Sequence, residues 1–184
     1  MIGCQIDTLL LIDSDISENE IRDKILSSNI LYVGGGDTIK MMEIWKQKNV
    51  DQYLIEAYKN NIVLSGVSAG SICWFERGHS DSNSFENADG CWEYTKAKGI
   101  GLISAIHCPH YNESGRETFD DMMKSENIHG IALENNCAFV IKDNMYRIIK
   151  SDCNSKAYLL KNNAGKVSKN ELIANEFSSI ATIL

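Results

Sequence analysis

The stretch from Ile62 to Phe75 constrains the fold of this chain most, because it joins a short apolar run to a helical pattern through small residues. Ile62 to Leu64 predicts a buried strand, and Ala69 to Phe75 predicts the first turns of a helix. Residues 66–70 between them read Gly-Val-Ser-Ala-Gly, a G-x-S-x-G pattern. In a strand-to-helix turn this pattern exposes the serine hydroxyl at a sharp corner, as a nucleophile elbow requires. It also fits an ordinary turn, so its meaning depends on partners for Ser68.

Strand and helix patterns alternate through the first part of the chain, which predicts parallel βαβ units and an α/β fold. We expect strands at Thr8 to Ile12 and Ile30 to Val33, and helices at Glu20 to Ser27, from Thr38 through Lys46, and at Asp51 to Asn60.

The pattern changes after Phe75. Glu76 to Lys98 is polar and without clear periodicity, so we expect a long loop over the site. We then expect a strand at Gly99 to Ile106, a helix at Arg116 to Lys124, and strands at Ala138 to Ile141, Tyr146 to Ile149 and Ala157 to Leu160. The whole chain, 1–184, is therefore predicted to be one domain: a mostly parallel sheet flanked by helices, with a small C-terminal β meander.

Composition narrows the classes of partner. The formal net charge of −7 disfavours nucleic acid and anionic membranes as partners. No apolar run approaches the roughly 20 residues that cross a bilayer, and no basic start precedes an apolar stretch. The six cysteines are scattered without a Cys-x-x-Cys pair, which predicts reduced thiols and neither a disulfide framework nor a zinc site. We expect a cytoplasmic protein with no metal or organic cofactor.

A serine nucleophile needs a general base, usually a histidine. Of the four histidines, His110 is the best candidate, because it follows an expected strand and begins a loop at the sheet edge where Ser68 should lie. We expect His107 to be structural. His79 lies in a polar loop, and His129 lies just before the β region.

The carboxylate that would orient the histidine is less defined. Asp81 follows Ser68 by thirteen residues, and Glu134 is its rival. Asp89 and Asp13 are weaker candidates.

Three glycines at 34–36 follow one expected strand and precede a helix. A phosphate cradle is one interpretation, but the Lys and Ser/Thr of a P-loop are missing. The other is an oxyanion hole, in which a backbone N–H of the glycine turn joins that of Ala69. Each such donor is worth about 3 kcal/mol of barrier in serine enzymes.

Several separated motifs together resemble peptidase family S51, the family of dipeptidase E (aspartyl dipeptidase). They read Val-Gly-Gly-Gly-Asp-Thr-Ile from 33, Gly-Val-Ser-Ala-Gly-Ser-Ile-Cys-Trp from 66, Asp-Ser at 81 and Pro-His-Tyr at 109, followed by an arginine. The resemblance implies a fold similar to class I glutamine amidotransferases. It implies Ser68 as nucleophile, His110 as base with Asp81 as partner, and Gly35 and Ala69 as oxyanion donors. Arg116 matches the arginine that recognises an N-terminal aspartate in the substrate.

The resemblance therefore implies a serine peptidase that cuts small peptides, with dipeptides beginning in aspartate as the expected substrates. Family members normally have a strand, a helix and a second strand before the segment that opens this sequence. A truncated product, an incompletely represented gene and completion by association, for example as a homodimer, all fit that difference. Two other functions stay open: a catalytically silent relative that acts in binding or assembly, and an esterase of the α/β-hydrolase type.

Overall fold

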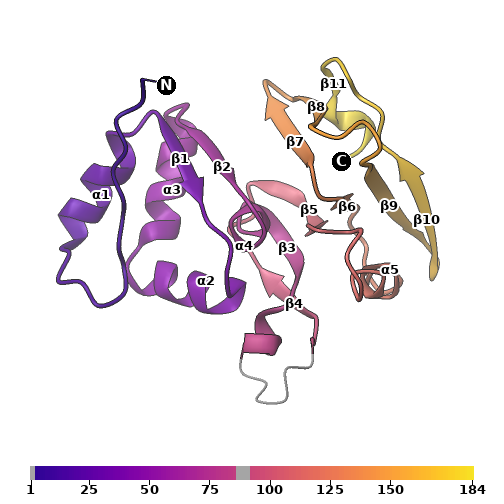
Figure 1. Ribbon diagram of the computed structural model, residues 1–184, viewed down its shortest axis with the longest axis horizontal. Helices are drawn as coiled ribbons and strands as arrows, with labels where there is room; N and C mark the ends of the chain where they lie inside the picture. The colour runs from indigo at the N-terminus through magenta and orange to yellow at the C-terminus, as the bar shows by residue number, and fades with distance from the viewer. Residues whose placement is uncertain (1–2, 86–91) are drawn as a thin grey trace.

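The computed structural model describes residues 3–85 and 92–184 (Figure 1). Its first part contains α1 (Glu18–Leu26), β1 (Ile30–Val33), α2 (Thr38–Gln47), α3 (Val50–Lys59), β2 (Val63–Gly66) and α4 (Ala69–Ile72). The middle contains β3 (Phe75–Ser80), a 3-10 turn (Ser82–Phe85), β4 (Thr95–Lys98), β5 (Ile103–Cys108) and α5 (Thr118–Met123). The last part contains β6 (Gly130–Leu133), β7 (Cys137–Lys142), β8 (Met145–Lys150), β9 (Ala157–Asn163), β10 (Lys166–Glu171), β11 (Ser178–Ser179) and a 3-10 turn (Ile180–Thr182).

The described strands form three sheets. β1 pairs with β2 in parallel, and a six-stranded sheet has the order β10-β9-β6-β5-β3-β4. The middle of this sheet, β3-β5-β6, is parallel, and its outer strands are antiparallel. β11, β8 and β7 form a third, antiparallel sheet. In Figure 1, α4 and β3 lie between the N-terminal and C-terminal parts. The predicted α/β fold with a parallel centre is confirmed. The strands expected to form a C-terminal meander are divided between two sheets, because β7 pairs with β8 while β9 pairs with β6 and β10.

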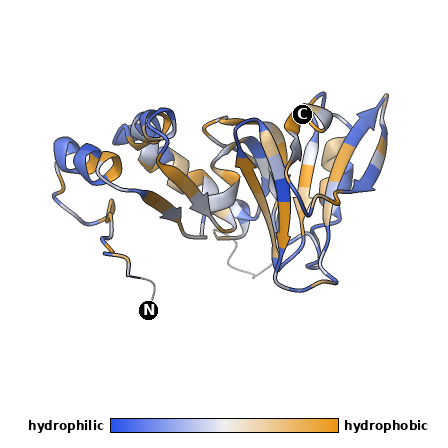
Figure 2. Cartoon of the chain, turned by 90° about the horizontal axis from the view of Figure 1, so that it is seen from above, coloured by the Kyte–Doolittle hydropathy of each residue, from blue (hydrophilic) through white to orange (hydrophobic). Residues whose placement is uncertain are grey.

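Apolar side chains hold these layers together. Figure 2 shows hydrophobic residues along β1 and along inner strands of the sheet. One continuous cluster extends from α1 and α3 through β1 and β2 to the C-terminal strands, with Ile21, Ile25 and Leu54 almost fully buried. A second cluster packs Phe119 and Met123 of α5 against the inner strands.

The helix expected from Ala69 to Phe75 is shorter in the structure, because α4 ends at Ile72 and β3 begins at Phe75. The carbonyls of Cys73, Trp74 and Phe75 accept hydrogen bonds from the backbone N–H groups of residues 100, 103 and 101. Pairing with a distant segment therefore takes the carbonyls that a longer helix would have used.

The loop expected at 76–98 is also wrong in part, because it contains β3 and β4. These strands pair antiparallel, with Arg77 opposite Lys98. Polar side chains of β3 are buried: His79 is 1% exposed and bonds to Thr118, and Ser80 donates to Thr38. Buried polar residues that find distant partners do not produce the apolar alternation by which a strand is recognised in a sequence.

The strand expected at Thr8 to Ile12 is likewise wrong, because this segment is irregular and Leu10 and Ile12 are 64% and 60% exposed. It lies across α2 instead, where residues 9–12 line a pocket together with Met41 and Trp45. Two of its apolar side chains, Leu9 and Leu11, pack against the hydrophobic core without strand pairing.

Candidate active site

Ser68 occupies a strained corner between β2 and α4. Its backbone has φ 55° and ψ −121°, a conformation that L-residues rarely adopt outside functional sites. The glycines on either side make the corner possible. A Cβ on Gly66 would lie 2.1 Å from the carbonyl oxygen of Gly70, and a Cβ on Gly70 would lie 2.1 Å from that of Val33. Residues 66–70 therefore have the close approach and strain that a nucleophile elbow requires.

Gly35 lies directly against the corner at Ser68. A Cβ at this position would lie 3.2 Å from Ser68 Cβ and 3.7 Å from Ser68 Oγ. The Ala69 N–H, on the other side of the serine, donates to no backbone carbonyl of the described residues. The structure thus brings Gly35, Ser68 and Ala69 together, as the glycine-turn interpretation of an oxyanion hole expects.

His110 follows β5 and Pro109, also with a positive φ of 55°. Its Nδ1 lies 2.6 Å from Asn135 Oδ1 and 3.7 Å from Glu113 Oε1. Asn135 Nδ2 donates to Glu113 Oε1 at 2.9 Å, which fixes the orientation of the amide. Because Asn135 Oδ1 can only accept, His110 Nδ1 must carry a proton, and Nε2 is left with the lone pair of a general base.

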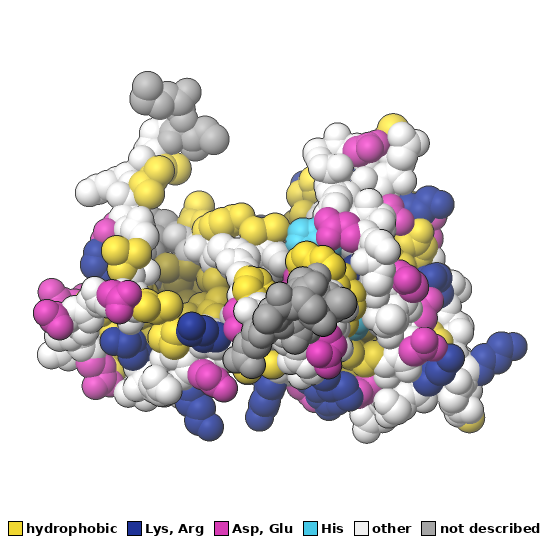
Figure 3. All heavy atoms as spheres, turned by 60° about the horizontal axis from the view of Figure 1, so that its bottom comes forward, with side chains coloured by type: hydrophobic (Ala, Val, Ile, Leu, Met, Phe, Trp, Pro, Cys, Tyr) yellow, Lys and Arg dark blue, Asp and Glu magenta, His cyan; other side chains and the backbone are white. Residues whose placement is uncertain are grey.

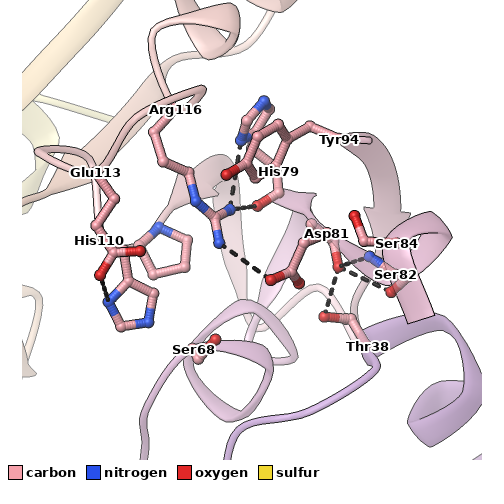
Figure 4. A network of polar contacts seen from close by, with 12 residues as sticks. Thr38, Ser68, His79, Asp81, Ser82, Ser84, Tyr94, His110, Glu113 and Arg116 are labelled. Carbon is pink, nitrogen blue, oxygen red and sulfur yellow. Dashed lines mark hydrogen bonds and ion pairs between the residues drawn. The ribbon is translucent and has the colours of Figure 1, made fainter. Parts of the chain in front are cut away.

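Asp81 is paired with Arg116 and not with His110. Asp81 Oδ2 lies 3.6 Å from Arg116 Nη2, while Arg116 Nη1 donates to the carbonyl oxygen of His79 at 2.7 Å. The guanidinium is buried at 3% exposure and lies 4.6 Å from the centre of the Tyr94 ring. In Figure 4, His110 lies to the left of Ser68 and Asp81 to the right, where it points toward Arg116.

The other carboxylate candidates do not reach the histidine either. Glu134 accepts from the Lys156 N–H at 2.8 Å and from the Tyr158 hydroxyl at 3.2 Å, so it faces β9. Burial and this carboxylate together raise the pKa of Tyr158 to about 12. Asp13 lies exposed in the N-terminal segment, and Asp89 lies outside the described residues.

Two of the remaining histidines are buried and uncharged. Burial lowers the pKa of His107 to about 4, and burial together with the positive charge of Arg116 does the same to His79. His107 Nδ1 donates to the carbonyl oxygen of Ile131, and His129 Nδ1 lies 2.7 Å from that of Ile183. These contacts leave His110 as the one of the four with a partly exposed ring, 24%, near Ser68 (Figure 4).

Sequence reasoning missed Asn135, Glu113 and Tyr94. Asn135 stands next to the considered Glu134, but a lone amide carries no sequence signal for orienting a histidine. Glu113 lies three residues after His110, a separation at which a loop side chain can return to the ring. Among the described residues, no hydrogen bond joins Ser68 Oγ to His110 (Figure 4). Such contacts are often long without substrate and shorten when it binds.

A pocket of about 390 Å³ reaches the glycine turn. It is lined by Gly35 and Gly36, by residues 9–12, and by α2 side chains including Met41 and Trp45. On the face of the molecule drawn in Figure 3, hydrophobic side chains gather over the N-terminal part of the chain. Within residues 3–85 and 92–184, no group of three or more His, Cys, Asp or Glu side chains is placed to hold a metal ion. No helix in the same residues has the length and apolar character to cross a membrane.

Comparison with known proteins gives this geometry a context. Residues 1–149 match the family model described as Peptidase family S51. The chain belongs to peptidase family S51. It is 32% identical to the uncharacterized peptidase YgaJ of Bacillus subtilis (strain 168) over 138 residues. This matching region covers 73% of this chain and 56% of that relative. The chain thus spans about half the length of this curated relative.

A solved structure shows the same fold. The crystal structure of a peptidase from an acI-B1 Actinobacterium superposes with a TM-score of 0.65 at 17% identity, over 88% of this chain and 63% of that one. The predicted resemblance to family S51 and the α/β fold that it implies are therefore confirmed.

Proposed function

We propose that this family S51 protein is a serine peptidase with Ser68 as its nucleophile. The observation that carries the proposal is the strained backbone of Ser68 at a strand-to-helix corner, facing a glycine that leaves the space beside Oγ open. Strain of this kind costs of order 1–3 kcal/mol and persists where the surrounding structure demands it. An ordinary βα turn does not need it.

The chemistry follows from the placed groups. His110 Nε2 takes the Ser68 proton as Oγ attacks the substrate carbonyl, and the N–H groups of Gly35 and Ala69 stabilise the oxyanion. His110 then gives this proton to the leaving amine, which departs as the acyl-enzyme forms. A water molecule releases the acyl group by the same route, with His110 as base for the water and then as acid for Ser68 Oγ.

We assign the orientation of His110 to Asn135, with Glu113 as a nearby negative charge. The amide oxygen holds the Nδ1–H tautomer, which is the one that leaves Nε2 free. Glu113, 3.7 Å from Nδ1, can stabilise the imidazolium that forms during the reaction. The alternative assignment to Asp81, which the family resemblance implies, requires that carboxylate to leave Arg116.

For the substrate we propose small peptides, with N-terminal aspartate as the preferred residue and Arg116 as the group that recognises it. A guanidinium suits a carboxylate in two-point contact, and Arg116 is buried near the elbow (Figure 4). Asp81 already shares this guanidinium at 3.6 Å, longer than a hydrogen bond. A substrate carboxylate must therefore share or displace Asp81, and the preference needs a test separate from that of the nucleophile.

The test is hydrolysis of aspartyl-p-nitroanilide by the wild type, Ser68→Ala and Ser65→Ala. Ser65 lies on β2, and its hydroxyl donates to the carbonyl oxygen of Leu31, so it controls for removing a serine near the elbow. We expect turnover in the wild type and Ser65→Ala, and a fall of up to about 10⁶ in Ser68→Ala. No turnover by folded wild type would favour the silent relative, and hydrolysis of simple esters alone would favour the esterase.

A further inference from the structure

Ser71 and His107 form a hydrogen-bonded pair directly behind the elbow. Ser71 Oγ, on α4, lies 2.7 Å from the carbonyl oxygen of Ser68 and 3.0 Å from His107 Nε2, on β5. His107 is 1% exposed, and its ring is stacked on Phe75 with 4.5 Å between centres. The pair therefore joins a rigid inner strand to the backbone of the proposed nucleophile.

The tautomer of His107 defines how the pair is held. Its Nδ1 lies 2.9 Å from the carbonyl oxygen of Ile131 on β6, and a carbonyl only accepts, so Nδ1 carries the proton. The uncharged ring then presents a lone pair at Nε2 to the Ser71 hydroxyl. Ser71 has one hydroxyl proton between two acceptors, His107 Nε2 and the Ser68 carbonyl oxygen. The two acceptors share that proton, with the carbonyl oxygen nearer at 2.7 Å than Nε2 at 3.0 Å, and the two contacts together hold the Ser71 side chain in one position.

The Ser68 carbonyl matters because it belongs to the same peptide unit as the Ala69 N–H. That unit is planar, so the direction of the carbonyl fixes the direction of the N–H. The carbonyl oxygen already accepts the N–H groups of Ser71 at 2.9 Å and Ile72 at 3.0 Å. The Ser71 hydroxyl adds a further donor. Donors at a carbonyl polarise its peptide unit and strengthen the N–H at the other end.

We propose that Ser71, held in place by His107, is a positioning residue for the oxyanion hole, because it aims and polarises the peptide unit that presents the Ala69 N–H. This inference rests on the proposed function. Ser71 touches no reacting atom, so its contribution belongs to the transition state, where charge develops on the substrate oxygen, and not to ground-state binding.

The experiment compares Ser71→Ala with Ser65→Ala, since both serines donate to a backbone carbonyl but only Ser71 contacts the Ser68–Ala69 peptide. We expect Ser71→Ala to lower kcat for aspartyl-p-nitroanilide about fivefold to tenfold, the effect of one hydrogen bond, with KM unchanged. Binding of an aspartyl aldehyde, which forms a tetrahedral adduct with a serine, should weaken by the same factor. Ser65→Ala should match the wild type in all three quantities.

A second pair of variants tests His107. His107→Gln keeps an acceptor near the position of Nε2, and His107→Asn keeps only a donor near Nδ1, while both lose the stacking on Phe75. We expect His107→Gln to retain several-fold more kcat than His107→Asn at similar stability. Equal kcat in the two variants would overturn the part assigned to His107.

The outcomes separate this inference from the function beneath it. Activity that depends on Ser68 but is the same in Ser71→Ala and Ser65→Ala would overturn the inference and leave the peptidase standing. An inactive folded wild type that is also unreactive with a fluorophosphonate would overturn both. The carbonyl ¹³C resonance of Ser68 gives a readout without turnover: we expect it to move upfield in Ser71→Ala, and an unmoved resonance would contradict the contact itself.

Discussion

Gly70→Ala is a substitution for which the structure predicts a large local effect. The added Cβ would lie 2.1 Å from the Val33 carbonyl oxygen, 2.5 Å from its carbon and 2.7 Å from the Gly34 carbonyl oxygen. All three atoms are backbone, so no side chain can rotate out of the way. To reach an ordinary contact of about 3.4 Å, α4 must move away from β1 by about 1 Å. Overpacking of this kind costs about 1–3 kcal/mol of unfolding free energy.

The displacement also reaches the proposed nucleophile, because Ser68 precedes α4 directly. A shift of about 1 Å in a catalytic group costs about 10²-fold in rate. The assay is urea denaturation at pH 7 together with aspartyl-p-nitroanilide hydrolysis of the folded variant. We expect a lower unfolding midpoint and a kcat reduced by about two orders of magnitude.

Gly34→Ala is the matched control for stability, because a Cβ there meets nothing within 4 Å. We expect its unfolding free energy to be unchanged or to rise by up to about 1 kcal/mol, since alanine restricts the unfolded chain. Equal unfolding midpoints for Gly70→Ala and Gly34→Ala would refute the close packing of α4 on β1.

Three further predictions follow from the buried charged and titratable groups. Arg116→Ala should abolish any preference for Asp-X over Ala-X amides in kcat/KM, and an unchanged ratio would remove Arg116 from substrate recognition. His79 and His107 have pKa values of about 4 in the folded chain and about 6.5 when unfolded, so the unfolded chain binds more protons below pH 6.5. The free energy of unfolding should therefore be highest above pH 6.5 and should fall as the pH drops toward 4. The free energy of unfolding from urea titrations should be about 2 kcal/mol per histidine higher at pH 7 than at pH 5. His107→Gln should remove the contribution of His107 to this difference. Glu126→Gln should lower the free energy of unfolding by about 1–2 kcal/mol, and by less at high salt, because this buried carboxylate pairs with the partly exposed Arg77 and Lys96. An unchanged free energy of unfolding at low salt would contradict this.

The sequence was informative where the signal is local. β1 follows from an apolar run, and α2 begins at a capping aspartate, Asp37, whose side chain accepts the N–H of Lys40. Ser68 can be recognised from the sequence because the glycines on either side of it are the residues that a close approach of neighbouring backbone segments requires. β3 could not be recognised, because its buried polar residues become satisfied only by distant partners such as Thr118 and Thr38.

The candidate site was predictable in its types of residue but not in its pairings. The residues leave Asp81 and Glu134 open as the partner of His110 and the family resemblance implies Asp81, whereas the structure gives that ring Asn135 and pairs Asp81 with Arg116. Which side chain meets which depends on how β3, β5 and the loops after β5 and β6 converge. No spacing within any one segment contains that information.

The central claim, that Ser68 is the nucleophile, is tested most directly by mass spectrometry after reaction with a fluorophosphonate. The wild type should gain one adduct, and peptide mapping should place it on Ser68. Ser68→Ala should gain none, and Ser65→Ala should react like the wild type. A folded wild-type protein that gains no adduct, or gains it on another serine such as Ser71, would contradict the account.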